Sequence, residues 1–181
     1  MSSFEKAFFI TLKNEGGFSN DKDDPGKATK YGITEATLRE YDPSLNVKDI
    51  TQETAKKIYK ANYWDRSKCD EICKLNQGLA VMVFDSGVNM GVGQAIKLLQ
   101  RTINLFYHEK IDVDGVIGGQ TLISLKLCLL KFEESFLDAY LAHWRMHYIN
   151  IVNKNPVMKK FINGWLNRVR YTRSKINTYN N

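Results

Sequence analysis

The sequence predicts an all-α fold, with at most one small β-hairpin near residues 17–33. Apolar residues recur with the 3.6-residue period of a helix through most of the 181-residue chain. Threonine and asparagine residues that can cap helices stand directly before several of these periodic segments. Only residues 17–33 are candidates for β-strands, and such strands would be short. With 43% hydrophobic and 12% aromatic residues, the chain can bury a substantial core.

The first helix is predicted to begin at a capping box made by Ser2 and Glu5. A stripe at helical spacing follows: Phe4, Ala7, Phe8, Thr11 and Leu12. Because the segment carries Glu5 and Lys6 and has no small-residue cleavage site, we interpret it as an amphipathic helix and not as a secretory signal. We therefore expect synthesis in the cytoplasm without a signal peptide, and any later export by another route.

Three further capping residues mark helix starts in the first half. Thr34 can cap a short helix that runs through Tyr41 and ends at the following "DP". Thr51 can start "QETAKKIYKANYW", and Asn76 precedes "QGLAVMVFDSGV".

The second half is predicted to hold four helices and one connector. "GQAIKLLQRTINLF" has one stripe: Ala95, Leu99, Thr102 and Phe106. "DVDGVIGGQT" is a turn-rich connector, and "LISLKLCLL" follows it. A long helix then surrounds Phe136, Tyr140, Trp144, His147 and Ile151. Asn155 and Pro156 open the last helix, with a predicted buried stripe of Val157, Phe161, Trp165, Val169, Thr172 and Ile176.

The chain shows no repeat, low-complexity tract or linker. The glycine-rich "NMGVG" of residues 89–93 is the best candidate for a boundary between two lobes. We therefore divide the chain into residues 1–92 and 93–181, packed into one unit. No apolar run approaches the roughly 18 residues that a membrane helix needs.

The cysteine and histidine residues do not have the spacing of a metal site. Cys69 and Cys73 lie one helical turn apart without a second ligand pair, and Cys128 stands alone, so reduced structural thiols are expected. His143 and His147 are also one turn apart and lack a third ligand. We expect no metal and no cofactor.

The formal net charge of +6 is concentrated near the C-terminus. No acidic residue follows Asp138, whereas eight basic residues do: Arg145, Lys154, Lys159, Lys160, Arg168, Arg170, Arg173 and Lys175. Such asymmetry indicates a polyanionic partner, although a solvated helix face explains it equally well. Because no nucleic-acid-binding motif is present, we do not expect nucleic acid as the partner.

One glutamate has an unusual position in the first helix. Glu15 follows Phe8 by seven residues and Phe4 by eleven, which places it within about 20° of both on the apolar face. Partial desolvation there is expected to raise its pKa, as a general acid requires. Gly16 and Gly17 then end the helix and let a substrate approach closely. A half-exposed glutamate beside a helix-ending glycine is the alternative.

Three further carboxylates follow on a loop that turns back toward this glutamate: Asp21, Asp23 and Asp24. A neutral acid facing an ionised carboxylate across a cleft is typical of glycosidases. A calcium loop is the competing interpretation of "NDKDDPG", but the alternating ligands and closing glutamate are missing.

These motifs resemble those of one known family. "NEGGFSNDKDDPGKATKYGIT", "YW" at residues 63–64 and "FDSGVNMGVGQAIKLLQ" are similar to the signature of glycoside hydrolase family 108, which contains phage endolysins and bacterial muramidases of the lysozyme superfamily. The resemblance includes "DGVIGGQT", which is similar to a motif of a peptidoglycan-binding family, and it ends with "GWLNRVR" at residues 164–170. The resemblance implies a lysozyme-like fold, with a catalytic part at residues 1–92 and a peptidoglycan-binding-like helical part at residues 93–181.

The resemblance also implies the catalytic residues. Glu15 matches the catalytic glutamate, and Asp24 follows after the eight intervening residues that are common in phage lysozymes. Thr29 matches the motif threonine, although its spacing is one residue short; Asp21 or Asp23 could replace Asp24. Glu15 would protonate the glycosidic oxygen, and Asp24, alone or with Thr29, would stabilise the charged sugar or hold the attacking water.

Five residues are candidates for substrate binding: Tyr31, Gly32, Trp64, Asp85 and Asn89. Tyr31 and Gly32 are expected on the cleft floor, and Trp64 either stacks on sugar or lies in the core. Asp85 and Asn89 are polar groups on an otherwise apolar helix, so they either bind substrate amides or hold the fold.

The expected activity is an endolysin that hydrolyses the β-1,4 bond between N-acetylmuramic acid and N-acetylglucosamine in peptidoglycan and lyses the host cell. A catalytically silent wall-binding or scaffold domain and a lytic transglycosylase are the alternatives. We expect a monomer that acts on the wall after release, with peptidoglycan glycan strands as its partner. Anionic wall polymers or outer-membrane lipid would bind the basic C-terminal helix.

Overall fold

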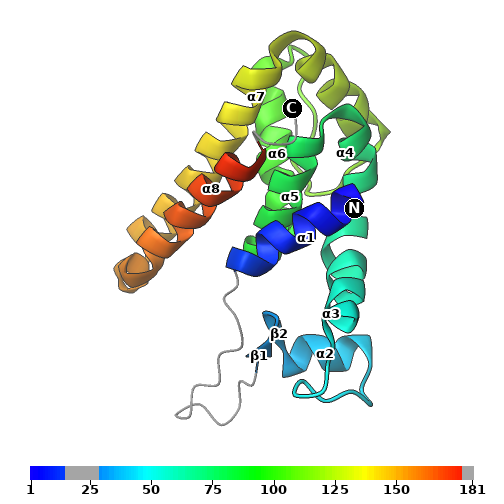
Figure 1. Ribbon diagram of the computed structural model, residues 1–181. Helices are drawn as coiled ribbons and strands as arrows, with labels where there is room; N and C mark the ends of the chain where they lie inside the picture. Colours follow the sequence, from blue (N-terminus) through cyan, green and yellow to red (C-terminus); the bar gives the residue numbers. More distant parts are fainter. Residues whose placement is uncertain (15–28, 177–181) are drawn as a thin grey trace.

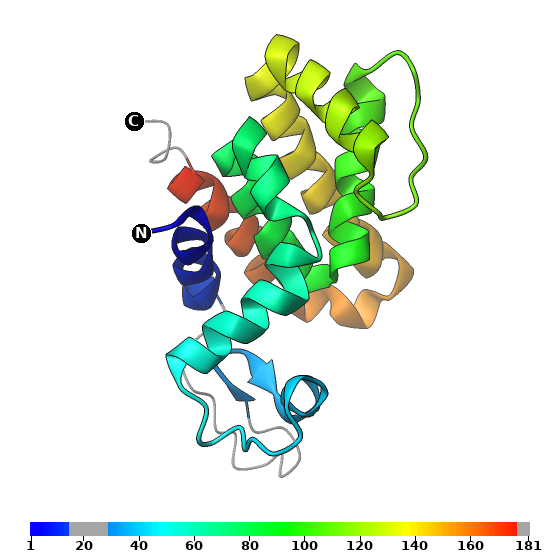
Figure 2. The same ribbon diagram turned by 90° about the vertical axis from the view of Figure 1, so that its right-hand side faces the viewer.

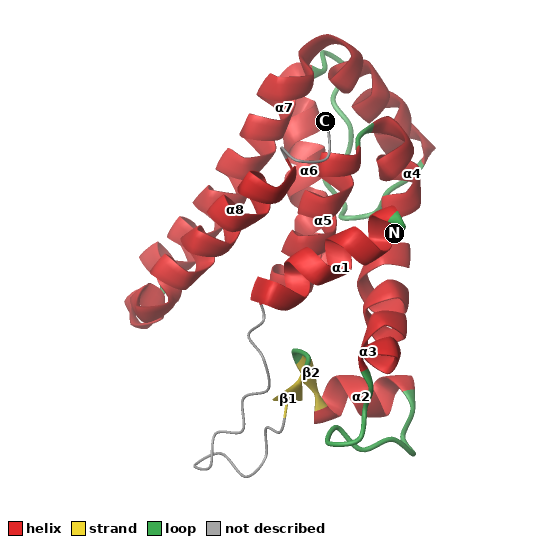
Figure 3. Cartoon of the chain, viewed as in Figure 1, coloured by secondary structure: helices red, strands yellow, loops and turns green. Residues whose placement is uncertain are grey.

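The computed structural model describes residues 1–14 and 29–176, and it confirms the predicted all-α fold. Helices make up most of this part of the chain (Figure 3). The α-helices are α1 (Ser3–Asn14), α2 (Glu35–Tyr41), α3 (Gln52–Tyr59), α4 (Cys69–Leu75), α5 (Gln77–Met90), α6 (Val92–Phe106), α7 (Gly119–Lys154) and α8 (Ile162–Ile176). A π-helical turn, η1 (Lys60–Asp65), continues α3, and a 3₁₀ helix, η2 (Pro156–Phe161), precedes α8.

The predicted capping residues start the helices. The amide of Glu5 donates to the Ser2 hydroxyl, and the amide of Ser2 donates back to the Glu5 carboxylate, which completes the capping box. Thr34, Thr51 and Asn76 each accept a backbone N–H in the first turn of α2, α3 and α5. These starts therefore follow from local chemistry.

The predicted β-hairpin is present at residues 29–34. Strand β1 (Thr29–Lys30) pairs antiparallel with β2 (Ile33–Thr34). Tyr31 and Gly32 form the turn, with φ angles of 56° and 73°. Positive φ at both central residues is the requirement of a type I′ turn.

The core is built around α5, whose residues from Gly78 to Gly87 are buried. Figures 1 and 2 show the other long helices arranged around it. Phe4 of α1, Trp64 of η1 and Phe84 of α5 form an aromatic cluster with ring centroids 5.5–5.9 Å apart. Such contacts fix α1 and the end of α3 on one face of α5.

Helices α7 and α8 form an arm that extends from the core (Figure 1). Helix α7 joins two predicted helices across a kink at Phe132, whose φ and ψ are −138° and 33°. The predicted stripe of the last helix is correct for Val169, Thr172 and Ile176, which are buried. It is wrong for Val157 and Phe161, which are 71% and 44% exposed. Both lie in η2, where 3.0 residues per turn breaks the 3.6-residue period.

The segment "DVDGVIGGQT" is a connector, as predicted, up to the start of α7 at Gly119. Gln100 of α6 holds it: the Gln100 amide donates to Asp114 and to the Val116 carbonyl, and its oxygen accepts the Gly115 N–H. This arrangement braces α6 against the connector.

All three cysteines are free thiols, and Cys69 and Cys128 are buried. Burial raises the pKa of the Cys69 thiol well above its ordinary value. Among residues 1–14 and 29–176, no helix has the length and apolarity required to cross a membrane.

Candidate active site

The predicted catalytic residues fall at the edge of the described structure. Glu15 and Asp24 lie outside the described residues. Thr29 opens β1, where its backbone is opposite Thr34. The described structure therefore provides the two supports on either side of the motif: α1, which ends at Asn14, and the hairpin of residues 29–34.

Tyr59 of α3 contacts both supports. Its ring packs edge-on against Phe8 of α1, with centroids 5.4 Å apart, and its hydroxyl donates to the Tyr31 carbonyl at 3.0 Å. Tyr59 is 2% exposed, so both contacts are sheltered from water. One buried side chain thus connects the middle of α1 to the turn of the hairpin.

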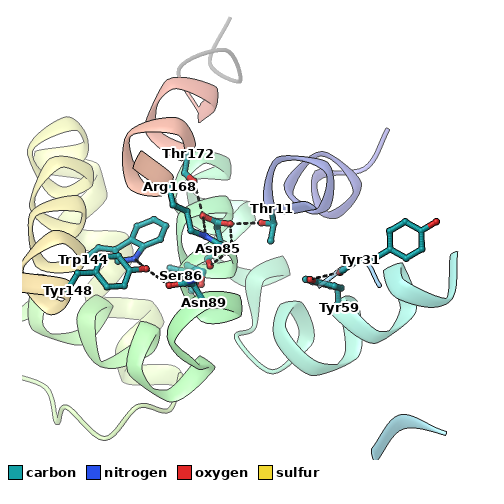
Figure 4. A network of polar contacts seen from close by, with 11 residues as sticks. Thr11, Tyr31, Tyr59, Asp85, Ser86, Asn89, Trp144, Tyr148, Arg168 and Thr172 are labelled. Atoms are coloured by element: carbon teal, nitrogen blue, oxygen red, sulfur yellow. Dashed lines mark hydrogen bonds and ion pairs between the residues drawn. The ribbon is translucent and has the colours of Figure 1, made fainter. Parts of the chain in front are cut away.

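Tyr31 is half-buried and Gly32 is exposed at the hairpin turn, and their place on a cleft floor stays a prediction. The Tyr31 ring is partly buried and points away from Tyr59 in Figure 4. The Lys30 ammonium lies 5.8 Å from its centroid. A non-glycine residue with positive φ is uncommon, and it is held here by the hydrogen bond to Tyr59.

Asp85 has a structural role in the core, which overturns its predicted contact with substrate. It is fully buried on α5, and its carboxylate accepts hydrogen bonds from three side chains (Figure 4). Thr11 of α1 donates at 2.8 Å, Thr172 of α8 at 2.8 Å, and Arg168 of α8 through Nη2 at 2.8 Å and Nε at 3.1 Å. With every side-chain oxygen occupied, Asp85 ties α1 and α8 to α5.

Trp64 belongs to the core, so the prediction that it stacks on sugar is wrong. Its side chain is fully buried among Phe4 and Phe84, and its indole N–H donates to Asp70 at 2.8 Å. A ring with no exposed face cannot contact a glycan.

Asn89 keeps an exposed position at the end of α5. Its side-chain oxygen accepts a hydrogen bond from the Tyr148 hydroxyl at 2.6 Å, and the Trp144 indole in turn donates to Tyr148 at 2.8 Å. These two consecutive hydrogen bonds orient the Asn89 amide (Figure 4). Asn89 therefore remains a candidate for binding substrate amides.

The sequence did not identify the partners of Asp85, although it contained a signal. Thr11 and Thr172 both stood on predicted apolar stripes, and Arg168 lies one turn before Thr172 on the same face. Polar groups on a buried face need partners, so these residues could have been matched to Asp85.

Comparisons with known proteins match two parts of the chain to family models. Residues 8–91 match the family model described as glycosyl hydrolase 108, and residues 94–170 match that of a predicted peptidoglycan domain. No curated protein matches the sequence. Among solved structures, SagA of Brucella abortus is 30% identical, with a TM-score of 0.72 over 97% of this chain and 94% of that chain. The chain therefore belongs to the glycosyl hydrolase 108 family of glycoside hydrolases that act on peptidoglycan.

Proposed function

We propose that this protein is an endolysin of the lysozyme type, which hydrolyses the β-1,4 bond between N-acetylmuramic acid and N-acetylglucosamine and so lyses bacterial cells. The observation that carries the proposal is the double contact of Tyr59, which fixes α1 and the hairpin on either side of the motif. Catalysis by two carboxyl groups requires both to be held at a defined separation, and firm supports at both ends of the motif favour this.

In this mechanism, Glu15 donates a proton to the glycosidic oxygen as the bond breaks. Asp24 stabilises the positive charge that develops on the sugar ring, alone or together with Thr29 holding the attacking water. Tyr31 offers its ring to a sugar face, and Asn89 offers an amide to the N-acetyl group.

Glu15→Gln tests the proposal, because it removes the proton donor while keeping the shape of the side chain. We expect release of fragments from purified peptidoglycan to fall at least a hundredfold, with unchanged thermal unfolding. Glu109→Gln is the matched control, since Glu109 is exposed and far along the chain from the motif, and it should retain full activity. An active Glu15→Gln variant would refute the assignment of the acid.

Mass spectrometry of the products tests the reaction itself. Hydrolysis leaves N-acetylmuramic acid with a reducing end, which contains one water more than the anhydro sugar left by a lytic transglycosylase. Anhydro products would show that the protein is a lytic transglycosylase and not a hydrolase. An absence of products would favour a catalytically silent wall-binding domain.

We also propose that the basic C-terminal region contacts an anionic wall polymer or outer-membrane lipid. Two of its eight basic residues have other roles: Arg168 is buried against Asp85, and Arg173 pairs with Asp138 at 2.9 Å. Lys154, Lys159 and Lys160 are exposed where α7 meets η2, and this cluster is the best candidate for the contact.

A further inference from the structure

A polar groove lies between α6 and α7, on the part of the chain that matches the peptidoglycan domain. Its volume is about 440 Å³, within the range of small-molecule sites. Its polar lining is made by Gln94 and Arg101 of α6 and by His143, His147, Asn150 and Lys154 of α7. Among residues 1–14 and 29–176 no carboxylate lines it, so the described groove presents cations, imidazoles and amides together.

The hydrogen bonds of His143 determine which ring nitrogen faces a ligand. The Thr102 hydroxyl has one proton, and while it donates this proton to the Leu98 carbonyl at 2.8 Å it accepts a hydrogen bond from His143 Nδ1, 2.9 Å away. Neutral His143 therefore carries its proton on Nδ1 and leaves Nε2 bare. Nε2 becomes a donor for an anion only when the ring takes up a second proton.

The surroundings of both imidazoles favour an anionic ligand. The pKa values of His143 and His147 are lowered, first by burial and then by the positive charge of Arg101. Arg101 of α6 and Lys154 of α7 are the charged residues that line the groove with them. Asp138, the last acidic residue of α7, is instead paired with Arg173 of α8. An anion bound here would offset the repulsion between Arg101 and the protonated imidazoles. It would thereby favour uptake of a proton by the imidazoles.

We propose that this groove binds a free carboxylate of the peptidoglycan peptide stem, an inference that rests on peptidoglycan as the substrate. Arg101 offers the planar pair of donors that matches a carboxylate. The amides of Gln94 and Asn150 can each donate to and accept from a peptide bond. Leu98 and Met146 complete the lining with apolar surface for alanine methyl groups. A bare phosphate would accept from the cations and the amide N–H groups, but it would leave the amide oxygens and the apolar surface unused.

Titration calorimetry on the full chain tests the site with a synthetic stem tetrapeptide and its counterpart with all carboxylates amidated. The free acid should bind at least tenfold more tightly than the amide, and more tightly than inorganic phosphate. Arg101→Gln should weaken binding of the acid about tenfold or more. Arg145→Gln, the same change on an exposed arginine of α7 outside the groove, should leave binding unchanged. Equal binding of acid and amide, stronger binding of phosphate, or equal losses in both variants would each overturn the proposal.

The pH dependence of the affinity provides a second test. Lowering the pH from 7.5 to 5.5 should tighten binding several-fold, because the imidazoles then become donors. The double variant His143→Gln/His147→Gln should bind with little dependence on pH, and a retained pH dependence would count against the two histidines. Because these assays measure binding, they can be repeated on Glu15→Gln. If the unaltered protein released no fragments from peptidoglycan but still bound the peptide, the proposed muramidase activity alone would be refuted.

Discussion

At the scale of single residues, burial decides between structural and functional roles that the sequence leaves open. Asp85 and Asn89 lie one turn apart on α5, and the sequence gives both the same two interpretations. The structure separates them: Asp85 is fully buried by α1 and α8, whereas Asn89 is exposed at the helix end. The difference arises from tertiary packing, so the sequence pattern of α5 alone could not reveal it.

The ion pair between Asp85 and Arg168 gives the first prediction at this scale. Asp85→Asn leaves the Arg168 guanidinium buried without its counter-charge, so the free energy of unfolding should fall by about 3–5 kcal/mol. Asp138→Asn removes a carboxylate that is 65% exposed, and it should cost less than about 1 kcal/mol. Urea unfolding followed by circular dichroism measures both. Similar losses for the two variants would show that the buried pair has no special weight.

At the scale of elements, the sequence predicts where helices begin better than how they continue. The starts at Ser2, Thr34, Thr51 and Asn76 are correct because each depends on a side chain bonding its own neighbouring backbone. The kink at Phe132 has no comparable local cause in the sequence.

The catalytic motif and its supports show the same limit of prediction. The residue types of "NEGG" and "DKDD" indicate glycosidase chemistry without any knowledge of the fold. The burial of Trp64 depends on Phe4 and Phe84, which are distant in sequence. The residue Tyr59 that joins α1 to the hairpin could not be singled out, because one aromatic residue on a helical stripe looks like any other core residue.

The connector before α7 provides a prediction at the scale of elements. Gly115 has a φ of +85°, and a Cβ atom there would lie 2.9 Å from the Gly93 carbonyl oxygen. Gly115→Ala should therefore lower the free energy of unfolding by about 1–3 kcal/mol, through backbone strain and through displacement of α6. Gly119→Ala, which meets no atom within 4 Å, should change it by less than about 0.5 kcal/mol. A harmless Gly115→Ala would mean that the connector moves independently of α6.

At the scale of the whole molecule, the two family regions share one core. Asp85, from the glycosyl hydrolase match, is bonded to Arg168, from the peptidoglycan-domain match. A second buried link joins the Ser86 and Tyr140 hydroxyls at 2.7 Å. Because these buried polar groups bond to one another across the boundary, we expect the two regions to unfold together and not as separate domains.

The dependence of stability on pH should occur in two steps. His143 and His147 have lowered pKa values in the folded state, so the unfolded chain binds more protons near pH 6.5 and below. The free energy of unfolding should therefore begin to fall as the pH drops through about 6.5. Glu5, Asp42 and Asp114 also have lowered pKa values through hydrogen bonds, so their contributions are lost only below about pH 4.5. In urea unfolding between pH 8 and 5, His143→Gln/His147→Gln should give a flatter profile, and an unchanged slope would contradict this origin.

The distribution of charge leads to the last prediction, which separates net charge from a local cluster. If the exposed lysines beyond α7 contact the anionic wall, Lys159→Glu/Lys160→Glu should weaken binding to whole walls and reduce its dependence on salt. Lys126→Glu/Lys131→Glu lowers the net charge by the same amount at the opposite end of α7, about 30 Å or more away. Exposed charges are screened over about 10 Å at 0.1 M salt, so this control should bind nearly normally in co-sedimentation with purified walls. Equal weakening at that salt concentration would assign the effect to the overall charge of +6 and not to the cluster.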